Sequence, residues 1–239
     1  MLKKQNLIVM LDSIIAMVGT NVIFQALDLE NSFNRLSVIH SDAFWLGIII
    51  AVSAFAINCR YLIISSAFGY IVGWILGVLF DSEWLCGETV MNSAPVWHIS
   101  VLVLLFIIAS VLEYLKAEKT NRKELMITVA SFLFLICSYF VIEYLLFSLS
   151  HGAVRALMRV SAVSICVSSF KKLRILPIFT SVGFAFGWVL GQLLEVKTTD
   201  PGGGSLSNDW IWHIAISVLF VMLGIIVEIF QRNINKKES

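Results

Sequence analysis

Long apolar runs constrain the fold of this chain more than any other feature of its sequence. Hydrophobic residues make up 59% of the 239 residues and charged residues only 14%, against about 45–50% and about 25% in soluble globular domains. Several runs reach or approach the roughly 20 apolar residues that a helix needs to cross a bilayer. We therefore expect an all-α integral membrane protein in contact with the lipid bilayer, and we exclude water-soluble folds.

Eight of these runs are candidate transmembrane helices. The second and the sixth are the shortest, close to the lower limit of about 17 residues, and the sixth also carries Arg155 and Arg159. The predicted spans are Leu7–Leu27, Ala43–Cys59, Tyr61–Phe80, Val96–Leu115, Leu125–Phe147, Val154–Phe170, Leu173–Leu194 and Trp210–Phe230.

The placement of basic residues supports this count. With a cytoplasmic N-terminus, eight spans leave only Arg35, Arg155, Arg159 and Lys197 of the 17 Lys and Arg residues on the outer side. Such a bias is typical of cytoplasmic loops, and omission of either short span would destroy it. We expect a multi-pass protein of the cell membrane with both termini in the cytoplasm. The net charge of +1 gives no reason to expect a nucleic-acid partner.

A glycine-rich pattern occurs twice along the chain. The first copy, Gly69–Gly77, reads Gly-Tyr-Ile-Val-Gly-Trp-Ile-Leu-Gly, and the second, Gly183–Gly191, reads Gly-Phe-Ala-Phe-Gly-Trp-Val-Leu-Gly. A Trp-His-Ile block follows each copy, at His98 and His213. The glycine blocks are 187 − 73 = 114 residues apart and the histidine blocks 213 − 98 = 115. Matches at nearly one spacing indicate an internal duplication.

The duplication predicts two tandem four-helix repeats, residues 1–117 and 118–239. Because each repeat holds an even number of spans, both enter the membrane in the same direction. The repeats are therefore parallel, related by an axis along the membrane normal, unlike the inverted repeats of many transporters.

The glycines of each copy recur every four residues and so share one helix face. Such faces allow close helix packing in lipid, which includes packing of the third helix against the seventh. The alternative is that they line a path or pocket for a slim ligand. The helix-packing candidates are Gly69, Gly73, Gly77, Gly183, Gly187 and Gly191.

All four histidines fall at predicted outer helix ends. Histidines converging from several helices could bind a divalent metal or respond to external acidity, which makes His40, His98, His151 and His213 weak metal candidates. No His-x-x-x-His pair is present, and neighbouring tryptophans favour interfacial anchoring instead. No cofactor is expected.

Four charged residues fall inside or near predicted spans: Asp12, Glu143, Arg155 and Arg159. A charge in the hydrocarbon region costs several kcal/mol unless it is paired or hydrated, so we expect these side chains to face the protein interior. Glu143 with Arg159 or Arg155 is the predicted pair. The four residues are candidates for a substrate site, and a purely structural ion pair is the alternative.

Two glutamates also match between the repeats, Glu113 and Glu228, at the inner ends of the fourth and eighth spans. Each has a basic residue within one helical turn, Lys116 and Arg232 respectively. Local ion pairs at the membrane boundary explain them without a proton path.

The chain carries no phosphate-binding glycine loop, no Gly-x-Ser-x-Gly and no His-Glu-x-x-His, and we do not expect an enzyme. The first hypothesis is a transport-class protein, either a permease or the membrane subunit of an exporter. It would move a small or amphipathic substrate at the interface of the two repeats. The alternative is a non-catalytic accessory or immunity-type protein that binds a membrane partner, and a homo-oligomer is also possible.

Overall fold

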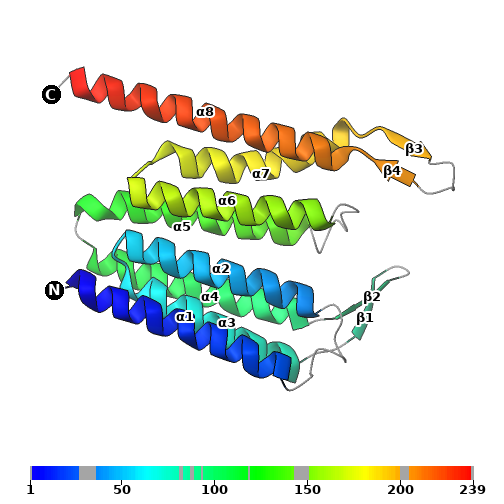
Figure 1. The fold of residues 1–239 in the computed structure, drawn as a ribbon, viewed down its shortest axis with the longest axis horizontal. Helices are drawn as coiled ribbons and strands as arrows, with labels where there is room; N and C mark the ends of the chain where they lie inside the picture. The colour runs from blue at the N-terminus through cyan, green and yellow to red at the C-terminus, as the bar shows by residue number, and fades with distance from the viewer. Residues whose placement is uncertain are drawn as a thin grey trace. The chain divides into compact units, whose positions relative to one another are not determined.

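The structure is a computed structural model that describes residues 2–26, 36–80, 83–86, 89–92, 94–117, 119–142, 151–199 and 205–237. Its described part is helical, with two short hairpins (Figure 1). The helices are α1 (Leu2–Ala26), α2 (Leu36–Ala56), α3 (Arg60–Leu79), α4 (Ala94–Lys116), α5 (Lys119–Phe140), α6 (His151–Lys171), α7 (Ile175–Leu193) and α8 (Asp209–Lys237).

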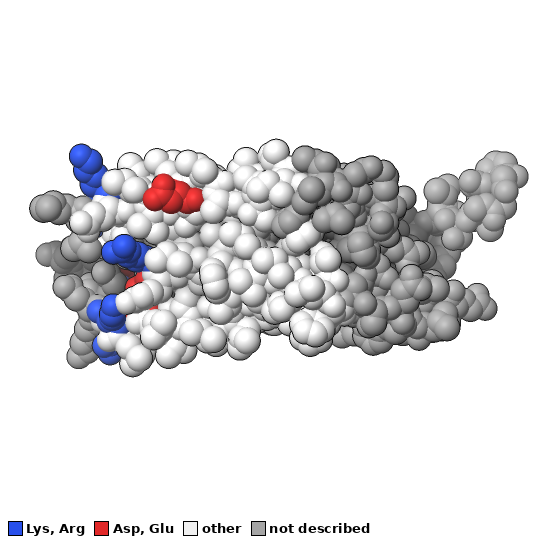
Figure 2. All heavy atoms as spheres, turned by 90° about the horizontal axis from the view of Figure 1, so that it is seen from below, with Lys and Arg blue, Asp and Glu red and all other residues white. Residues whose placement is uncertain are grey.

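Seven of these helices are long and apolar enough to cross a membrane. The remaining helix, α2, has a shorter apolar stretch, Asp42–Ala56. Figure 2 shows one face of the molecule, where Lys and Arg gather at one end and the other described surface is uncharged apart from an acidic patch near that end. The prediction of an all-helical, multi-pass membrane protein is confirmed at this level.

The chain packs as two units, residues 1–125 and 126–239. Unit 1 contains α1–α4, and unit 2 contains most of α5 together with α6–α8. In each unit, the last two helices pack closely along each other and are joined at one end by a hairpin (Figure 1). The predicted boundary after residue 117 precedes α5, whereas the units divide inside the first turns of that helix.

One hairpin lies between α3 and α4 and the other between α7 and α8. In unit 1, β1 (Glu83–Cys86) pairs antiparallel with β2 (Thr89–Asn92). In unit 2, β3 (Lys197–Thr199) pairs antiparallel with β4 (Ser205–Ser207). The sequence did not predict these hairpins because strands of three or four residues are too short to show an alternating pattern.

A tight turn ends α2 and α6 in the same way. Asn58 and Lys172 have positive φ angles of 62° and 52°, and they are 172 − 58 = 114 residues apart. After each of them, a backbone N–H reaches back five residues: Cys59 donates to Ala54 O at 2.8 Å and Leu173 to Ser168 O at 2.9 Å. This is the left-handed helix end known as the Schellman motif. It reverses the chain so that α3 and α7 begin at once.

Candidate functional site

The glycines of α3 face α4 within unit 1. An added Cβ at Gly73 would lie 2.7 Å from His98 Cδ2 and 2.8 Å from the His98 carbonyl oxygen. At Gly69 it would lie 3.2 Å from the Cα of Leu102. The backbones of the two helices therefore approach closely where α3 has no side chain, and His98 occupies the hollow.

Unit 2 contains the same joint between α7 and α8. A Cβ at Gly187 would lie 2.8 Å from both Cδ2 and the carbonyl oxygen of His213, and one at Gly183 would lie 2.5 Å from Phe220 Cβ. At Gly191 the nearest atom would be the Asp209 carbonyl oxygen, at 2.8 Å. In both units the described contacts of these glycines are to the following helix. Packing of α3 against α7 concerns both units and stays a prediction.

Each joint buries a histidine against an aromatic ring. His98 is 1% exposed and its ring centroid lies 5.4 Å from that of Tyr70. His213 is 2% exposed, lies 5.2 Å from the Phe184 ring, and places Nε2 at 2.9 Å from the Phe184 carbonyl oxygen. That bond requires the proton on Nε2. Both rings are buried inside their own units near the start of α4 and of α8, and their position at the membrane interface stays a prediction.

The proposed metal site remains without structural support. Among the residues that the structure describes, no group of three or more His, Cys, Asp or Glu side chains is placed to hold a metal ion. The side chains of His40 and His151 lie outside the described part of the chain. The tryptophans beside the two Trp-His-Ile blocks have similar exposure. Trp97, Trp210 and Trp212 are each about two-fifths exposed, as expected of a belt at a membrane surface.

Glu113 and Glu228 bind the first turn of the preceding helix in the sequence. Glu228 Oε2 accepts the backbone N–H groups of Arg174 at 3.0 Å and Ile175 at 2.7 Å, and Glu113 accepts the N–H of Tyr61. A carboxylate is favourable at a helix N-terminus, where N–H groups are unpaired and the helix dipole is positive. The predicted ion pair of Glu228 with Arg232 is also present, at 3.5 Å.

This clamp was not predicted. The sequence signal was available, because both glutamates keep the spacing of the repeat and both lie one helix after a turn without its own capping side chain. In unit 1, the Lys116 ammonium group donates a hydrogen bond to the Tyr61 hydroxyl. Its charge also acts on the Glu113 carboxylate.

The four predicted substrate-site residues have different positions. Asp12 is exposed on α1 of unit 1, while Arg155 and Arg159 are half-buried on α6 of unit 2, one turn apart. Glu143 lies outside the described residues. The expectation that every charge faces the interior is therefore wrong for Asp12, and the pairing of Glu143 with an arginine stays a prediction.

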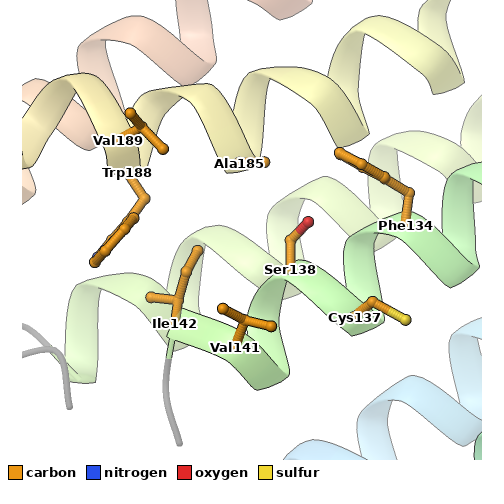
Figure 3. Close-up of a pocket in the computed structure, with 8 residues that line it drawn as sticks. All are labelled: Phe134, Cys137, Ser138, Val141, Ile142, Ala185, Trp188 and Val189. Carbon is orange, nitrogen blue, oxygen red and sulfur yellow. The ribbon is translucent and has the colours of Figure 1, made fainter. Parts of the chain in front are cut away.

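A pocket of about 350 Å³ opens between α5 and α7 in unit 2 (Figure 3). Its walls are apolar apart from the Ser138 hydroxyl, and Phe134 and Val189 at its edge are 47% exposed. The size lies within the range of small-molecule sites. The chain around α5 contributes Phe134, Cys137, Ser138, Val141 and Ile142, and α7 contributes Ala185, Trp188 and Val189.

The pocket uses a different face of α7 from the glycine joint. Ala185 and Val189 line the pocket, whereas Gly183 and Gly187 face α8. The prediction missed this face because it followed the glycines. A signal does exist: Ala185 is 185 − 71 = 114 residues after Ile71, so the second glycine pattern has a small side chain where the first has a large one.

Hydroxyl groups connect α6 with both helices that form the pocket. Thr128 on α5 lies 3.4 Å from Ser169 on α6, and Ser164 on α6 lies 3.3 Å from Thr180 on α7, measured between hydroxyl oxygens. Helix α6, with its two arginines, is therefore a neighbour of both pocket walls. Such bonds between helices are favourable in lipid, where no water competes.

Comparison with models of protein families, with curated proteins and with solved structures gives no match.

Proposed function

We propose that this chain is a transport-class membrane protein, a permease or the membrane subunit of an exporter, that moves a small or amphipathic substrate. Its architecture would be eight spans in two tandem parallel four-helix repeats, with both termini in the cytoplasm. Three features spaced by 114 or 115 residues support the duplication: the glycine–histidine joints, the glutamate clamps and the left-handed turns at Asn58 and Lys172.

The pocket of unit 2 is the observation on which the transport hypothesis rests. A helix bundle that only anchored a protein in lipid would gain by filling such a space, since voids cost packing contacts. Here the pocket is kept beside a helix that carries Arg155 and Arg159 inside an apolar segment. Charges within a membrane span are costly and commonly mark substrate pathways.

Flux across proteoliposomes tests this proposal. The full chain would be reconstituted with carboxyfluorescein, ethidium and a fluorescent lauric acid as alternative cargoes. We expect one of them to cross faster than in empty vesicles, and Arg159→Ala and Glu143→Ala each to abolish that flux while insertion into the vesicles remains normal. Full flux in both variants would contradict the proposal.

Asp12 favours the alternative function, an accessory protein that binds a membrane partner. Its carboxylate is exposed within the apolar segment Lys4–Ile23, where an unpaired charge is costly. A partner helix with a Lys or Arg at the same depth would offset that cost.

Affinity purification from native membranes tests this alternative against transport. A partner recovered in stoichiometric amount with the wild-type chain and lost with Asp12→Leu would support it. Asp12→Asn, which keeps the size and a hydrogen-bonding group, is the matched control. Purification of the chain alone, together with cargo flux, would reject it.

A further inference from the structure

The α5–α7 pocket of unit 2 opens among exposed apolar side chains. Phe134 and Val189 at its edge are each 47% exposed. They belong to the apolar spans Arg122–Phe140 and Ile175–Leu193, which are long enough to cross a membrane. Exposed apolar surface within such a span is in contact with lipid chains. A hydrophobic molecule can therefore enter the pocket from the bilayer without crossing water.

The size and the walls of the pocket suit one uncharged molecule. Its volume of about 350 Å³ lies near the lower end of the range of about 300–1,000 Å³ for small-molecule sites, so it suits a single hydrocarbon chain. None of the eight described residues that line it is Lys, Arg, His, Asp or Glu. A charge placed against these side chains would be desolvated and unpaired, which is very costly. An ionised group is therefore excluded from the pocket.

One hydroxyl group points into this apolar space. Ser138 extends from α5 toward Ala185 on α7 (Figure 3), where the small alanine side chain leaves room opposite it. A hydroxyl group in an apolar environment gains from a hydrogen bond, because no water competes for it there. The Ser138 hydroxyl can donate to an oxygen of a molecule that occupies the pocket.

Trp188 contributes a donor to the opposite wall. Its ring extends from α7 toward Ile142 on the α5 side (Figure 3), and its indole Nε1 is buried without a hydrogen-bond partner among the described residues. An indole N–H can only donate, and a buried donor without an acceptor costs free energy. Both Ser138 and Trp188 therefore favour an occupant that carries an acceptor.

We propose that the α5–α7 pocket binds an uncharged hydrophobic molecule with a carbonyl oxygen, to which the Ser138 hydroxyl donates a hydrogen bond. A fatty-acid ester or a protonated fatty acid carries this chemistry. This ligand class is the substrate class of the proposed transport function, on which its biological role rests, although binding can be measured without flux. The ester can be a free molecule or an ester group of a bilayer lipid.

Quenching of Trp188 fluorescence by brominated chains tests the proposal. The full chain would be placed in nanodiscs of ether-linked phosphatidylcholine, which lack ester carbonyls, and titrated with methyl dibromostearate or with dibromo-octadecane. We expect saturable quenching by the ester, with the quenched component absent from Trp188→Phe. The hydrocarbon should bind about fivefold more weakly, which is the contribution of one hydrogen bond between neutral groups.

The charged form of the same chain tests the exclusion of ionised groups. Dibromostearate, in buffer that ionises it, should bind about tenfold more weakly than the ester or worse, because the pocket walls offer its charge no partner. Tighter binding of the ionised acid than of the ester would overturn the proposal.

Variants separate the hydroxyl from the pocket. Ser138→Ala should weaken the ester about fivefold and leave the hydrocarbon unchanged, whereas Ser138→Thr, which retains the hydroxyl, should keep the preference for the ester. Ala185→Phe should remove quenching by both compounds, with Val218→Phe on an exposed face of α8 as the matched addition of a ring. If Ala185→Phe fails to fold, Ala185→Ile carries the same test, because unit 1 has Ile71 at the matching position.

Two results would overturn separate parts of the site. Equal binding of ester and hydrocarbon, or unchanged ester affinity in Ser138→Ala, would overturn recognition of the carbonyl oxygen. Unchanged quenching in Ala185→Phe and Ala185→Ile would overturn the pocket as the binding site.

Discs of ester-linked phosphatidylcholine distinguish the two sources of the ligand. Weaker binding of the added ester in these discs would support the proposal with bilayer lipids as the source, because their ester groups then compete for the pocket. Equal binding in both kinds of disc would support it with a free ester as the ligand. Saturable binding without any flux would support this inference and contradict the transport function, whereas flux without Trp188 quenching would do the reverse.

Discussion

The two units of this protein share the close glycine contact between their last two helices. They differ on the other face of α3 and α7, the face that does not carry these glycines. In unit 1, α1 packs directly against α2 and α3, and Met17 lies against Gly47 so closely that a Cβ there would lie 2.9 Å from its sulfur. In unit 2, a pocket separates α5 from α7. The features held in common hold the last two helices of each unit together, and among the described residues the α5–α7 pocket is a feature of unit 2.

Unit 1 also ties its first helix to the turn after its second. Asn6 donates its amide to the Asn58 side chain at 2.7 Å. The same turn contains Cys59, whose thiol is buried; burial and the charge of Glu113 raise its pKa to about 12. In unit 2, hydroxyl contacts join α6 to α5 and to α7. Helix α5 also buries Phe132, Leu135 and Ile136, each 2% exposed or less, so the pocket lies beside a well-packed helix.

The largest expected effect on stability concerns the glycine contacts at Gly73 and Gly187, which are alike in the two units. Gly187→Ala and Gly73→Ala should each lower the unfolding free energy by about 3 kcal/mol, the upper end of overpacking costs, because the added methyl meets a backbone carbonyl at 2.8 Å in both cases. Unfolding in mixed detergent micelles measures this. Gly19→Ala, with no atom within 4 Å of the added methyl, is the control and should change little. A large effect in only one unit would break the comparison.

The glutamate clamps come next. Glu228→Gln should cost about 2 kcal/mol, since hydrogen bonds to charged groups contribute about 1.5–3 kcal/mol and two backbone N–H groups lose such a partner. Glu113→Gln should cost a similar amount, because Glu113 interacts with the backbone N–H groups of both Tyr61 and Leu62.

Arg232→Gln removes the ion pair together with the hydrogen bonds of Arg232 to the Lys171 and Lys172 carbonyl oxygens. Its cost is therefore an upper limit on the contribution of the exposed ion pair, which should be under about 1 kcal/mol. A loss in Glu228→Gln below about 1 kcal/mol would contradict the clamp at the helix start.

A smaller effect is expected at the hydroxyl contact between α5 and α6. Thr128→Val keeps the side-chain shape and should destabilise the protein by about 0.6 kcal/mol, the mean for hydrogen bonds between membrane helices. Thr20→Val on α1 removes only a bond to its own helix at Ala16 and should change less. A loss above about 2 kcal/mol at Thr128 would show that this hydroxyl contact contributes more than a typical hydrogen bond between membrane helices.

The smallest effect on stability is expected where the functional effect is greatest. Ala185→Ile makes unit 2 match Ile71 of unit 1 and should leave the unfolding free energy within about 0.5 kcal/mol or raise it, as cavity-filling changes do. Flux of the cargo should nevertheless be lost. Retention of flux would show that the pocket is not the site.

The helical, multi-pass character of the chain could be predicted from its sequence because apolar runs of this length leave few alternatives. The repeat spacing also located the residues of both joints. It could not show that the glycines receive the next helix of the same unit, because a small-residue face fits any close neighbour.

The candidate site was less accessible from the sequence. Arg155, Arg159 and Asp12 could be singled out because a charge in the hydrocarbon region costs free energy. Which of these side chains is exposed depends on helix packing, which the sequence does not give. The pocket walls are ordinary apolar residues such as Val141 and Val189, which no motif distinguishes from core. Only the missing bulk at Ala185 relative to Ile71 marks it, and that signal requires the two copies to be aligned first.

The central claim is that the features shared by the two units stabilise the protein, whereas the pocket of unit 2 carries its function. The most direct test is cargo flux into proteoliposomes that contain matched variants. Uptake of fluorescent lauric acid would be compared for the wild type, Ala185→Ile in unit 2 and Ile71→Ala at the matching position of unit 1. We predict loss of flux in Ala185→Ile and normal flux in Ile71→Ala. Wild-type flux in Ala185→Ile, or equal loss in both variants, would contradict it.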